Sequence, residues 1–341
     1  MFETFTSLLG APFIQFLPPG EQFSLWSLAG ALLTAAIVYL MRRPGRIRLR
    51  ARALIRGFFP ARIWRHPSSL LDYRFFFVSS WFYASGILGL FGFSEIAKRF
   101  THAALDLTIG QRSTATGPEP LLTIAMPVLY VLVYDLAYWA AHYLMHRLPV
   151  LWEFHKVHHS AEVMTPFTEW RQHPVELLMF PLFAGSAIGI LYATVDHVFG
   201  PRSQGFSLLN VNILLYVYML SFLHLRHSHL WIAARGWLGH IVQSPAQHQI
   251  HHSTEPRHHD RNLGLSLSVW DWAFGTLYVP ETRERLVFGI GAEGKTHDGI
   301  WRTFWQPFAK AAVILAGPAE EKPGADGTMT GLAESQPSGK S

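Results

Sequence analysis

The chain has 341 residues, of which half are hydrophobic and only 15% are charged, compared with about a quarter in an average soluble domain. It contains no cysteine, which excludes disulfides and thiolate metal sites and leaves nitrogen and oxygen as the ligands for any metal. The length would permit two soluble domains, but the apolar composition favours one membrane-embedded unit.

Five stretches of the chain are apolar over a length close to the about 20 residues that a membrane-spanning helix needs. In chain order they are residues 23–41, 75–96, 121–144, 175–199 and 206–223. Pro181 and Gly185 interrupt the fourth stretch, which predicts a kinked helix or a re-entrant hairpin there. Residues 317–341 are rich in Gly, Pro, Glu, Ser and Lys and are expected to form a disordered tail.

A run of seven arginines directly follows the first apolar stretch. The run consists of Arg42, Arg43, Arg46, Arg48, Arg50, Arg52 and Arg56. Such a run suits either a nucleic-acid patch or a juxtamembrane anchor, and its place after an apolar segment favours the anchor. Because positive residues stay on the cytoplasmic side, we expect the first, third and fifth spans to end in the cytoplasm.

Histidines are concentrated in one part of the chain, with sixteen of the nineteen between His142 and His259. Three sets have regular spacing: His142-x₃-His146, His155-x₂-His158-His159 and His248-x₂-His251-His252. Residues three or four apart share one face of a helix, so each set can aim its imidazoles at one point. Eight histidines exceed the four ligands of one zinc ion, which predicts two metal ions in one pocket. The order of the spans brings all three sets to the cytoplasmic face.

Simpler explanations exist for single features of this pattern. His142 and His146 alone would suit polar residues at a membrane interface, but the two triplets that follow favour metal binding. Asp135 shares a helical face with His142 and is predicted to accept the outer N–H of a ligating histidine. Tyr138, Trp139 and Trp152 lie near span ends and are expected to be interfacial aromatic residues.

Short motifs flank the histidine sets. They are Leu151-Trp152-Glu153-Phe154 with Ser160, then Arg171-Gln172-His173-Pro174, Asn262-Leu263-Gly264 and Trp270-Asp271-Trp272-Ala273-Phe274-Gly275-Thr276. Together with the three histidine boxes, these motifs resemble the membrane fatty acid hydroxylase/sterol desaturase superfamily, in its bacterial sterol desaturase-like form. The resemblance covers residues 121–280, the expected catalytic domain. It leaves an N-terminal transmembrane region at 1–120, a C-terminal extension at 281–316 and the tail at 317–341.

The resemblance implies an all-α, polytopic integral membrane protein with about five spanning helices and a cytosolic helical cap that carries the boxes. It implies a di-iron centre that uses O₂ to attack a lipid C–H bond, in a multi-pass protein expected in a bacterial inner membrane. It also implies one further ligand after the last span, where His227 fits best and His224 less well. The implied metal ligands are His142, His146, His155, His158, His159, His227, His248, His251 and His252.

The remaining histidines are not expected to bind metal. His173 precedes a proline and is predicted to have a structural or outer-sphere role. His229, His258 and His259 are predicted to lie on the surface, and His197 near the outer membrane face. His66, His102, His240 and His297 have no partner at ligand spacing.

The chemistry expected of such a site is oxidation. All-imidazole ligation suits iron, copper or zinc, but zinc has no redox chemistry and would imply hydrolysis. The H-E-x-x-H motif of metalloproteases is absent at the first two boxes, because Tyr143 follows His142 and Lys156 follows His155. No GxGxxG, flavin or haem motif is present, so a reductase with a ferredoxin or cytochrome b5-type protein is expected to supply electrons. We expect a hydroxylase of a fatty acyl or sterol-like lipid, and a desaturase and a non-catalytic metal-binding or transport protein remain as alternatives.

Overall fold

The computed structural model describes residues 10, 13, 16–42, 51–85, 89–112, 119–200, 207–208, 211–296 and 299–317. Its longer helices are α2 (Leu25–Met41), α5 (Pro67–Ala84), α6 (Phe93–Thr108), α7 (Glu119–Arg147), α8 (Pro149–His159), α9 (Pro174–Phe199) and α15 (Ile300–Ala316). The shorter ones are α3 (Ala51–Phe58), α4 (Ala61–Trp64), α10 (Ile213–Tyr218), α11 (His224–Arg226), α12 (Trp237–Ile241), α13 (Pro245–His251) and α14 (Val269–Ala273). Single turns of tighter or wider helix occur at η1 (Gly89–Phe91), η2 (Pro166–Trp170), η3 (Met219–Leu223), η4 (Pro256–His258) and η5 (Gly291–Thr296).

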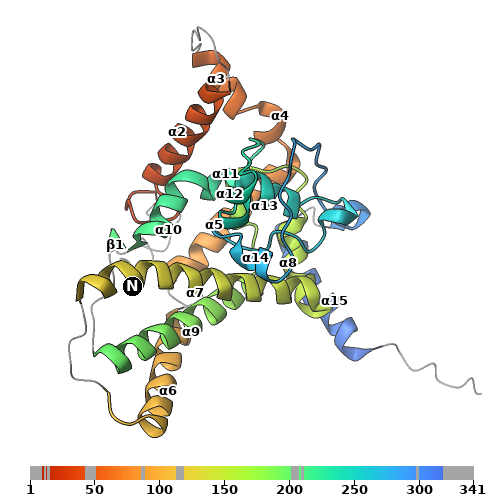
Figure 1. Ribbon diagram of the computed structural model, residues 1–341. Coiled ribbons are helices and arrows are strands. Elements are labelled where there is room, and N and C mark those ends of the chain that lie inside the picture. Colours follow the sequence, from red (N-terminus) through yellow and green to blue (C-terminus); the bar gives the residue numbers. More distant parts are fainter. Residues whose placement is uncertain are drawn as a thin grey trace, which may run out of the picture.

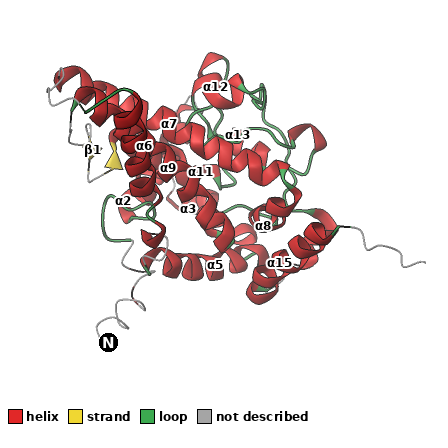
Figure 2. Ribbon diagram, turned by 90° about the horizontal axis from the view of Figure 1, so that it is seen from below, coloured by secondary structure: helices red, strands yellow, loops and turns green. Residues whose placement is uncertain are grey.

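Helix α7 is the long central element of the fold. Figure 1 shows α9 and α6 on one side of it, and α8, α11, α13 and α14 on the other. The view from below places α6 and α9 in front of α7 (Figure 2). The strands of the described residues, β1 (Ser207–Leu208) and β2 (Val211–Asn212), form one short antiparallel pair. The mostly helical fold class is therefore confirmed.

The packing of α6 against α9 depends on a small residue. At Gly189, a Cβ atom would lie 2.2 Å from the carbonyl oxygen of Ser94 on α6, so any side chain would force the two helices apart. Lys98 and Asp196 add an ion pair of 3.1 Å between the same helices. Helix α6 is thereby fixed to α9, which in turn packs against α7 and supports the histidine-bearing segments.

Two helices of the described residues are long and apolar enough to cross a membrane, namely Leu122–Arg147 and Pro174–Phe199. They correspond to the third and fourth predicted spans. Helix α9 continues without a break through Pro181 and Gly185, so a re-entrant hairpin is wrong. Leu25–Met41 and Ile213–Arg226 are apolar but shorter helices. The count of five spans and the cytosolic cap stay predictions.

The structure alters the bounds of two predicted spans. The stretch 75–96 is not one helix, because α5 ends at Ala84 and α6 begins only after Gly92. The stretch 206–223 begins with the β1–β2 pair, and its helix starts at Ile213, where Asn212 accepts hydrogen bonds from the backbone N–H groups of Leu214 and Leu215. Apolar composition alone predicted neither the break between α5 and α6 nor the helix cap at Asn212.

The arginine run and the tail lie mainly outside the described residues. Arg42 donates to the carbonyl oxygen of Trp231 at 2.7 Å, and Arg52 and Arg56 lie on α3. Arg43, Arg46, Arg48 and Arg50 are outside the described residues, as is the tail after Gly317. The domain boundaries at residues 120, 280 and 316 stay predictions.

Candidate metal centre

The first two histidine boxes lie on consecutive helices. His142 and His146 are one turn apart near the end of α7, and Leu148 links α7 to α8. Pro149 occupies the first turn of α8, where its missing N–H is not needed, and Ser160 ends the helix just after His159. The tight connection folds α8 back so that His142 Nε2 lies 3.0 Å from His155 Nε2.

The third box lies at the end of α13, a short helix with a strong start signal, and His252 is the C-cap of that helix. Ser244 and Gln247 form a capping box, and Pro245 follows the cap. His227 reaches the same place from another direction, because it ends α11 directly after the π-helical turn η3. Such turns often occur at functional sites, since they shift the register of the residues that follow.

All nine predicted ligands come together, in two adjacent groups. The five-histidine group contains His142, His146, His155, His159 and His251, and the four-histidine group contains His158, His227, His248 and His252. Within each group, the candidate ligand atoms all lie within 4.8 Å of one another. Across the groups, the rings of His159 and His252 stack at 4.5 Å between centroids.

Each triplet contributes to both groups, which corrects the expectation that a box aims at one point. His155 and His159, four residues apart, enter the five-histidine group, whereas His158 enters the four-histidine group. On α13 the assignment is reversed: His248 and His252 enter the four-histidine group and His251 the other. Adjacent residues such as His158 and His159 point about 100° apart around a helix, so they serve different groups.

The inward ring nitrogens have the spacing that a shared cation requires. His227 Nε2 lies 2.8, 3.1 and 3.1 Å from the Nε2 atoms of His248, His158 and His252. Two nitrogens that each bind one ion at about 2.1 Å lie about 3.0–3.4 Å apart. A proton can bridge only one such pair at a time, so a metal ion accounts better for several mutually close acceptors.

Oxygen atoms lie close to the outer nitrogens of five of these histidines. His142 Nδ1 lies 2.7 Å from the carbonyl oxygen of Leu263, and His251 Nδ1 lies 2.9 Å from that of Arg261. Carboxylate oxygens face the other three Nδ1 atoms: Asp260 at 3.3 Å from His146, Glu176 at 3.1 Å from His155 and Glu169 at 2.8 Å from His227. An acceptor beside Nδ1 favours a proton there and leaves the Nε2 lone pair for a metal.

Burial keeps the imidazoles of the centre neutral. It lowers the pKa of each box histidine outside the spanning helices well below its usual value, and neighbouring rings or arginines lower it further. These residues are His155, His158, His159, His248, His251 and His252. A neutral imidazole is the form that binds metal, so the site is prepared for a cation rather than for protons.

Glu169 carries the negative charge of the four-histidine group. Burial alone would raise the pKa of this carboxyl, but Arg226 and His227 outweigh burial and lower it. Arg226 Nε lies 3.4 Å from Glu169 Oε2, and a second guanidinium nitrogen donates to the hydroxyl of Tyr138 at 3.0 Å. The carboxylate therefore remains ionised beside His227.

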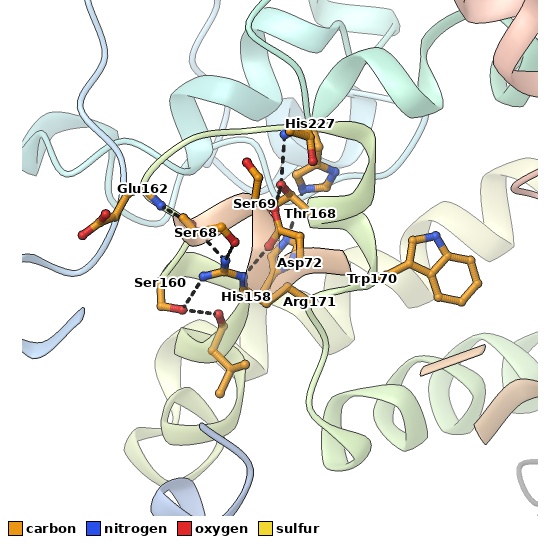
Figure 3. Close-up of polar contacts among 12 residues, drawn as sticks. Ser68, Ser69, Asp72, His158, Ser160, Glu162, Thr168, Trp170, Arg171 and His227 are labelled. Carbon is orange, nitrogen blue, oxygen red and sulfur yellow. Dashed lines mark hydrogen bonds and ion pairs between the residues drawn. The ribbon is translucent and has the colours of Figure 1, made fainter. Parts of the chain in front are cut away.

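A buried arginine holds η2 and the end of α8 in place. Arg171 Nε donates to Asp72 at 2.6 Å, while its terminal nitrogens donate to Ser160 and Ser68. Thr168 donates to the other oxygen of Asp72 at 2.7 Å. Figure 3 shows Arg171 at the centre of these contacts, with His158 and His227 close by. Arg171, the first residue of the Arg171-Gln172-His173-Pro174 motif, thus connects α5 to the segments that carry Glu169 and the second box.

The motifs that begin at Asn262 and at Trp270 shape the loop whose carbonyl oxygens, of Leu263 and Arg261, lie beside the histidines. Asp271 accepts from the backbone N–H groups of Leu263 and Gly264 at 2.8 and 2.9 Å, and from Trp139 on α7 at 3.2 Å. A Cβ on Gly264 would lie 2.3 Å from the carbonyl oxygen of Leu267, so the turn requires glycine. Burial raises the pKa of Asp271 to about 6.

The structure places several predicted residues elsewhere. Asp135 touches no histidine; its carboxylate accepts from the backbone N–H groups of Leu265, Ser266 and Leu267 in the same loop. Tyr138 and Trp139 are buried rather than interfacial. Trp152 packs on the rings of His146 and His159. Asp135 and Trp139 face inward because the loop after α13 folds back over α7, and Tyr138 faces inward because it stacks on Phe180 of α9.

The other histidines divide as follows. His173 begins α9, accepting from Val175 N–H, and its second nitrogen contacts the Phe304 carbonyl, so a structural role fits. His224 Nε2 lies 2.9 Å from the hydroxyl oxygen of Ser27, and His224 belongs to neither histidine group. His259 is exposed, but His258 is buried beside Glu284, which corrects its predicted surface position. His197 is the 24th residue of α9, about 35 Å from the end of that helix that lies near the centre.

Comparison with known proteins gives a family match and several distant relatives. Residues 127–276 match the model of the fatty acid hydroxylase family. Alkylglycerol monooxygenase of Xenopus tropicalis is 29% identical over 197 residues, 54% of this chain and 40% of that protein. Ornithine lipid hydroxylase OlsE of Rhizobium tropici is 27% identical over 187 residues, 54% of this chain and 50% of that protein. The chain therefore spans half or less of the length of these relatives, and no solved structure gives a significant match.

Proposed function

We propose that the chain belongs to the fatty acid hydroxylase/sterol desaturase superfamily and is an oxidoreductase that hydroxylates a C–H bond of a membrane lipid. The observation that carries the proposal is the convergence of nine histidine ligand atoms in two adjacent groups. Two of its relatives are named as a monooxygenase and a hydroxylase of lipids, which favours hydroxylation over desaturation.

The nine histidines would hold two iron ions, one in each group. All-nitrogen ligation suits iron, and zinc would supply no redox chemistry. Iron held by these residues would supply the electron transfers by which O₂ oxidises an unactivated C–H bond. The electrons would come from a separate reductase with a ferredoxin or a cytochrome b5-type protein.

The chain's own residues orient the ligands and balance charge. Leu263, Arg261, Asp260, Glu176 and Glu169 hold the outer ring nitrogens, so each of these rings presents Nε2 inward. Three of the five partners are carboxylates, which offset the charge of two cations in a buried site. The buried rings also exclude bulk water, which protects a reactive centre from side reactions.

A cavity of about 290 Å³ offers a place for the substrate beside the four-histidine group. Glu169, the partner of His227, and Tyr138, whose ring lies 5.7 Å from that of His142, form part of its wall. Apolar side chains of η3 and its neighbours, such as Met219 and Leu223, form another part. This mixture suits a lipid, either a fatty acyl chain or a sterol-like molecule, whose reacting carbon faces the centre.

The centre would lie on the cytoplasmic side of a membrane. His142 and His146 occupy the last two turns of α7, one of the two helices that are long enough to cross. The arginines after the first apolar helix favour a cytoplasmic position for the side of the membrane on which the centre is expected. A centre at the end of the spans, rather than in the middle of them, also suits an enzyme better than a transporter.

The test is a reconstituted assay with iron-loaded protein, lipid vesicles, reductase, ferredoxin and ¹⁸O₂. We expect about two irons per chain and one labelled oxygen in the lipid product. A product that has lost two hydrogens and carries no label would assign a desaturase. Label that comes from H₂¹⁸O without any reductant would overturn the proposal and indicate a hydrolase.

A further inference from the structure

A second cavity lies beside the one assigned to the substrate, and its lining is almost wholly apolar. It has a volume of about 180 Å³ and lies between α2, α3, α4 and η2. Leu28, Ala31, Phe58, Trp64 and Phe167 form part of its wall. Neither the histidine centre nor the fold requires an empty apolar space of this kind.

The two cavities share one wall, in which the central side chain is Phe23. Gln22 and Leu223 line the first cavity, while the next residues in sequence, Phe23 and His224, line the second. The Phe23 ring lies 5.9 Å from that of Trp170, which lines the first cavity, and 5.0 Å from that of Phe167, which lines the second. Phe23 is fully buried and lies between residues of both linings, so its ring forms part of the partition between the cavities.

The second cavity reaches the outer face of α2. Leu32 lines the cavity and still has 40% of its surface exposed. Further along the exposed side of α2 lie Leu33 and Ile37, which present apolar surface outward. If α2 lies in a bilayer, a hydrocarbon chain enters this cavity directly from the lipid.

We propose that the second cavity is a binding site for one unbranched hydrocarbon chain of a membrane lipid, and that Phe23 separates this chain from the substrate in the first cavity. The proposal rests on the proposed lipid substrate only for the role of the wall. The apolar lining recognises alkyl chains and no polar group, because an unpaired polar atom there would lose its water without gaining a partner.

Photolabelling tests occupancy of the cavity. The probe is a phosphatidylcholine with a diazirine at the end of one chain, mixed into phosphatidylcholine vesicles that hold the full-length protein. Mass spectrometry should find the label on Met164 or Phe59, which line the second cavity. Ala31→Leu should fill the cavity and abolish this label, whereas Ala36→Leu, the same change on the same helix but outside the lining, should preserve it. Equal labelling in both variants, or label spread evenly over the exposed face of α2, would overturn the site.

A second experiment tests the wall. Phe23→Ala should join the cavities, so that the longest substrate chain converted increases by a few methylenes, whereas Phe23→Leu should keep the limit of the native protein. If the longest substrate chain converted is unchanged in a Phe23→Ala protein with native iron content, Phe23 does not separate the two cavities. Photolabelling needs neither iron nor O₂, so a protein that makes no product still reports on the second cavity, and the two proposals fail separately.

Discussion

The two histidine groups differ in how firmly the protein orients them. In the five-histidine group, four outer nitrogens lie beside oxygen atoms, and two of these oxygens are backbone carbonyls fixed by a network of hydrogen bonds. In the four-histidine group, the Glu169 carboxylate lies beside His227, but the Nδ1 atoms of His158, His248 and His252 have neither a hydrogen-bond nor an ion-pair partner among the described residues. A ring with a fixed outer partner loses less freedom when it binds metal, so the five-histidine group should bind its ion more tightly.

The largest effect should come from removing a ligand. His251→Ala deletes a member of the five-histidine group and His248→Ala a member of the other, and each should lower activity by more than about 100-fold, because loss of an outer partner alone costs about 10–100-fold. Iron content per chain should fall in both variants while membrane insertion is unchanged. Full activity in either variant would show that the substituted histidine is not a ligand of the centre.

The order in which the ions leave tests the difference between the groups directly. Titration of the iron-loaded protein with a chelator should release one iron well before the other. Mössbauer spectra of protein with half its iron should show the remaining ion in the site that His251→Ala disrupts. Simultaneous release, or a remaining ion that depends on His248 alone, would contradict the comparison.

Changes to the outer partners should have intermediate effects, and on one group each. Glu169→Gln keeps the size of the side chain but removes the charge beside His227, so it should weaken iron binding in the four-histidine group by about 10–100-fold. Glu176→Gln is the matched variant for the five-histidine group, through His155. If both variants lose the same ion, the outer partners do not act on separate groups.

The smallest effect should come from a contact outside both groups. Glu293 joins Lys156 on α8 to Lys310 on α15; burial alone would raise its pKa, but the two lysines lower it to about 2. Its contribution to the docking of α15 is therefore present above pH 4.5 and is lost as the pH falls towards 2. A fluorophore on Val313→Cys, unique because the chain has no cysteine, should report this loss in metal-free protein. Glu293→Gln should remove the pH dependence, and iron content at neutral pH should not change.

The candidate centre could be predicted from sequence better than the surroundings that orient it. Helical spacing identified eight of the nine histidines that the structure brings together, and the family resemblance added His227. Glu169, Glu176 and Asp260 gave no such signal, because single carboxylates reach their histidines through tertiary packing rather than through a local pattern. The same limit explains Asp135: helical spacing placed it on the face of His142, but the loop after α13 supplied a nearer set of donors.

The fold showed the same division. The two longest apolar stretches became α7 and α9, because in each of them no turn interrupts the apolar run. The break between α5 and α6 and the start of the helix at Ile213 depend on a turn and a cap of a few residues, which an average over an apolar window hides.

The crossed assignment of the two triplets constrains how this centre can change over evolution. Because α8 and α13 each supply both groups, an inserted or deleted residue in either helix turns histidines away from two candidate metal positions at once. Neither triplet can be lost while one position is kept whole, and a centre with a single metal is not reached by discarding one helix. Substitutions can accumulate in the walls of the cavities and adapt the protein to new lipids, whereas the spacing of the histidines is inherited as one indivisible unit.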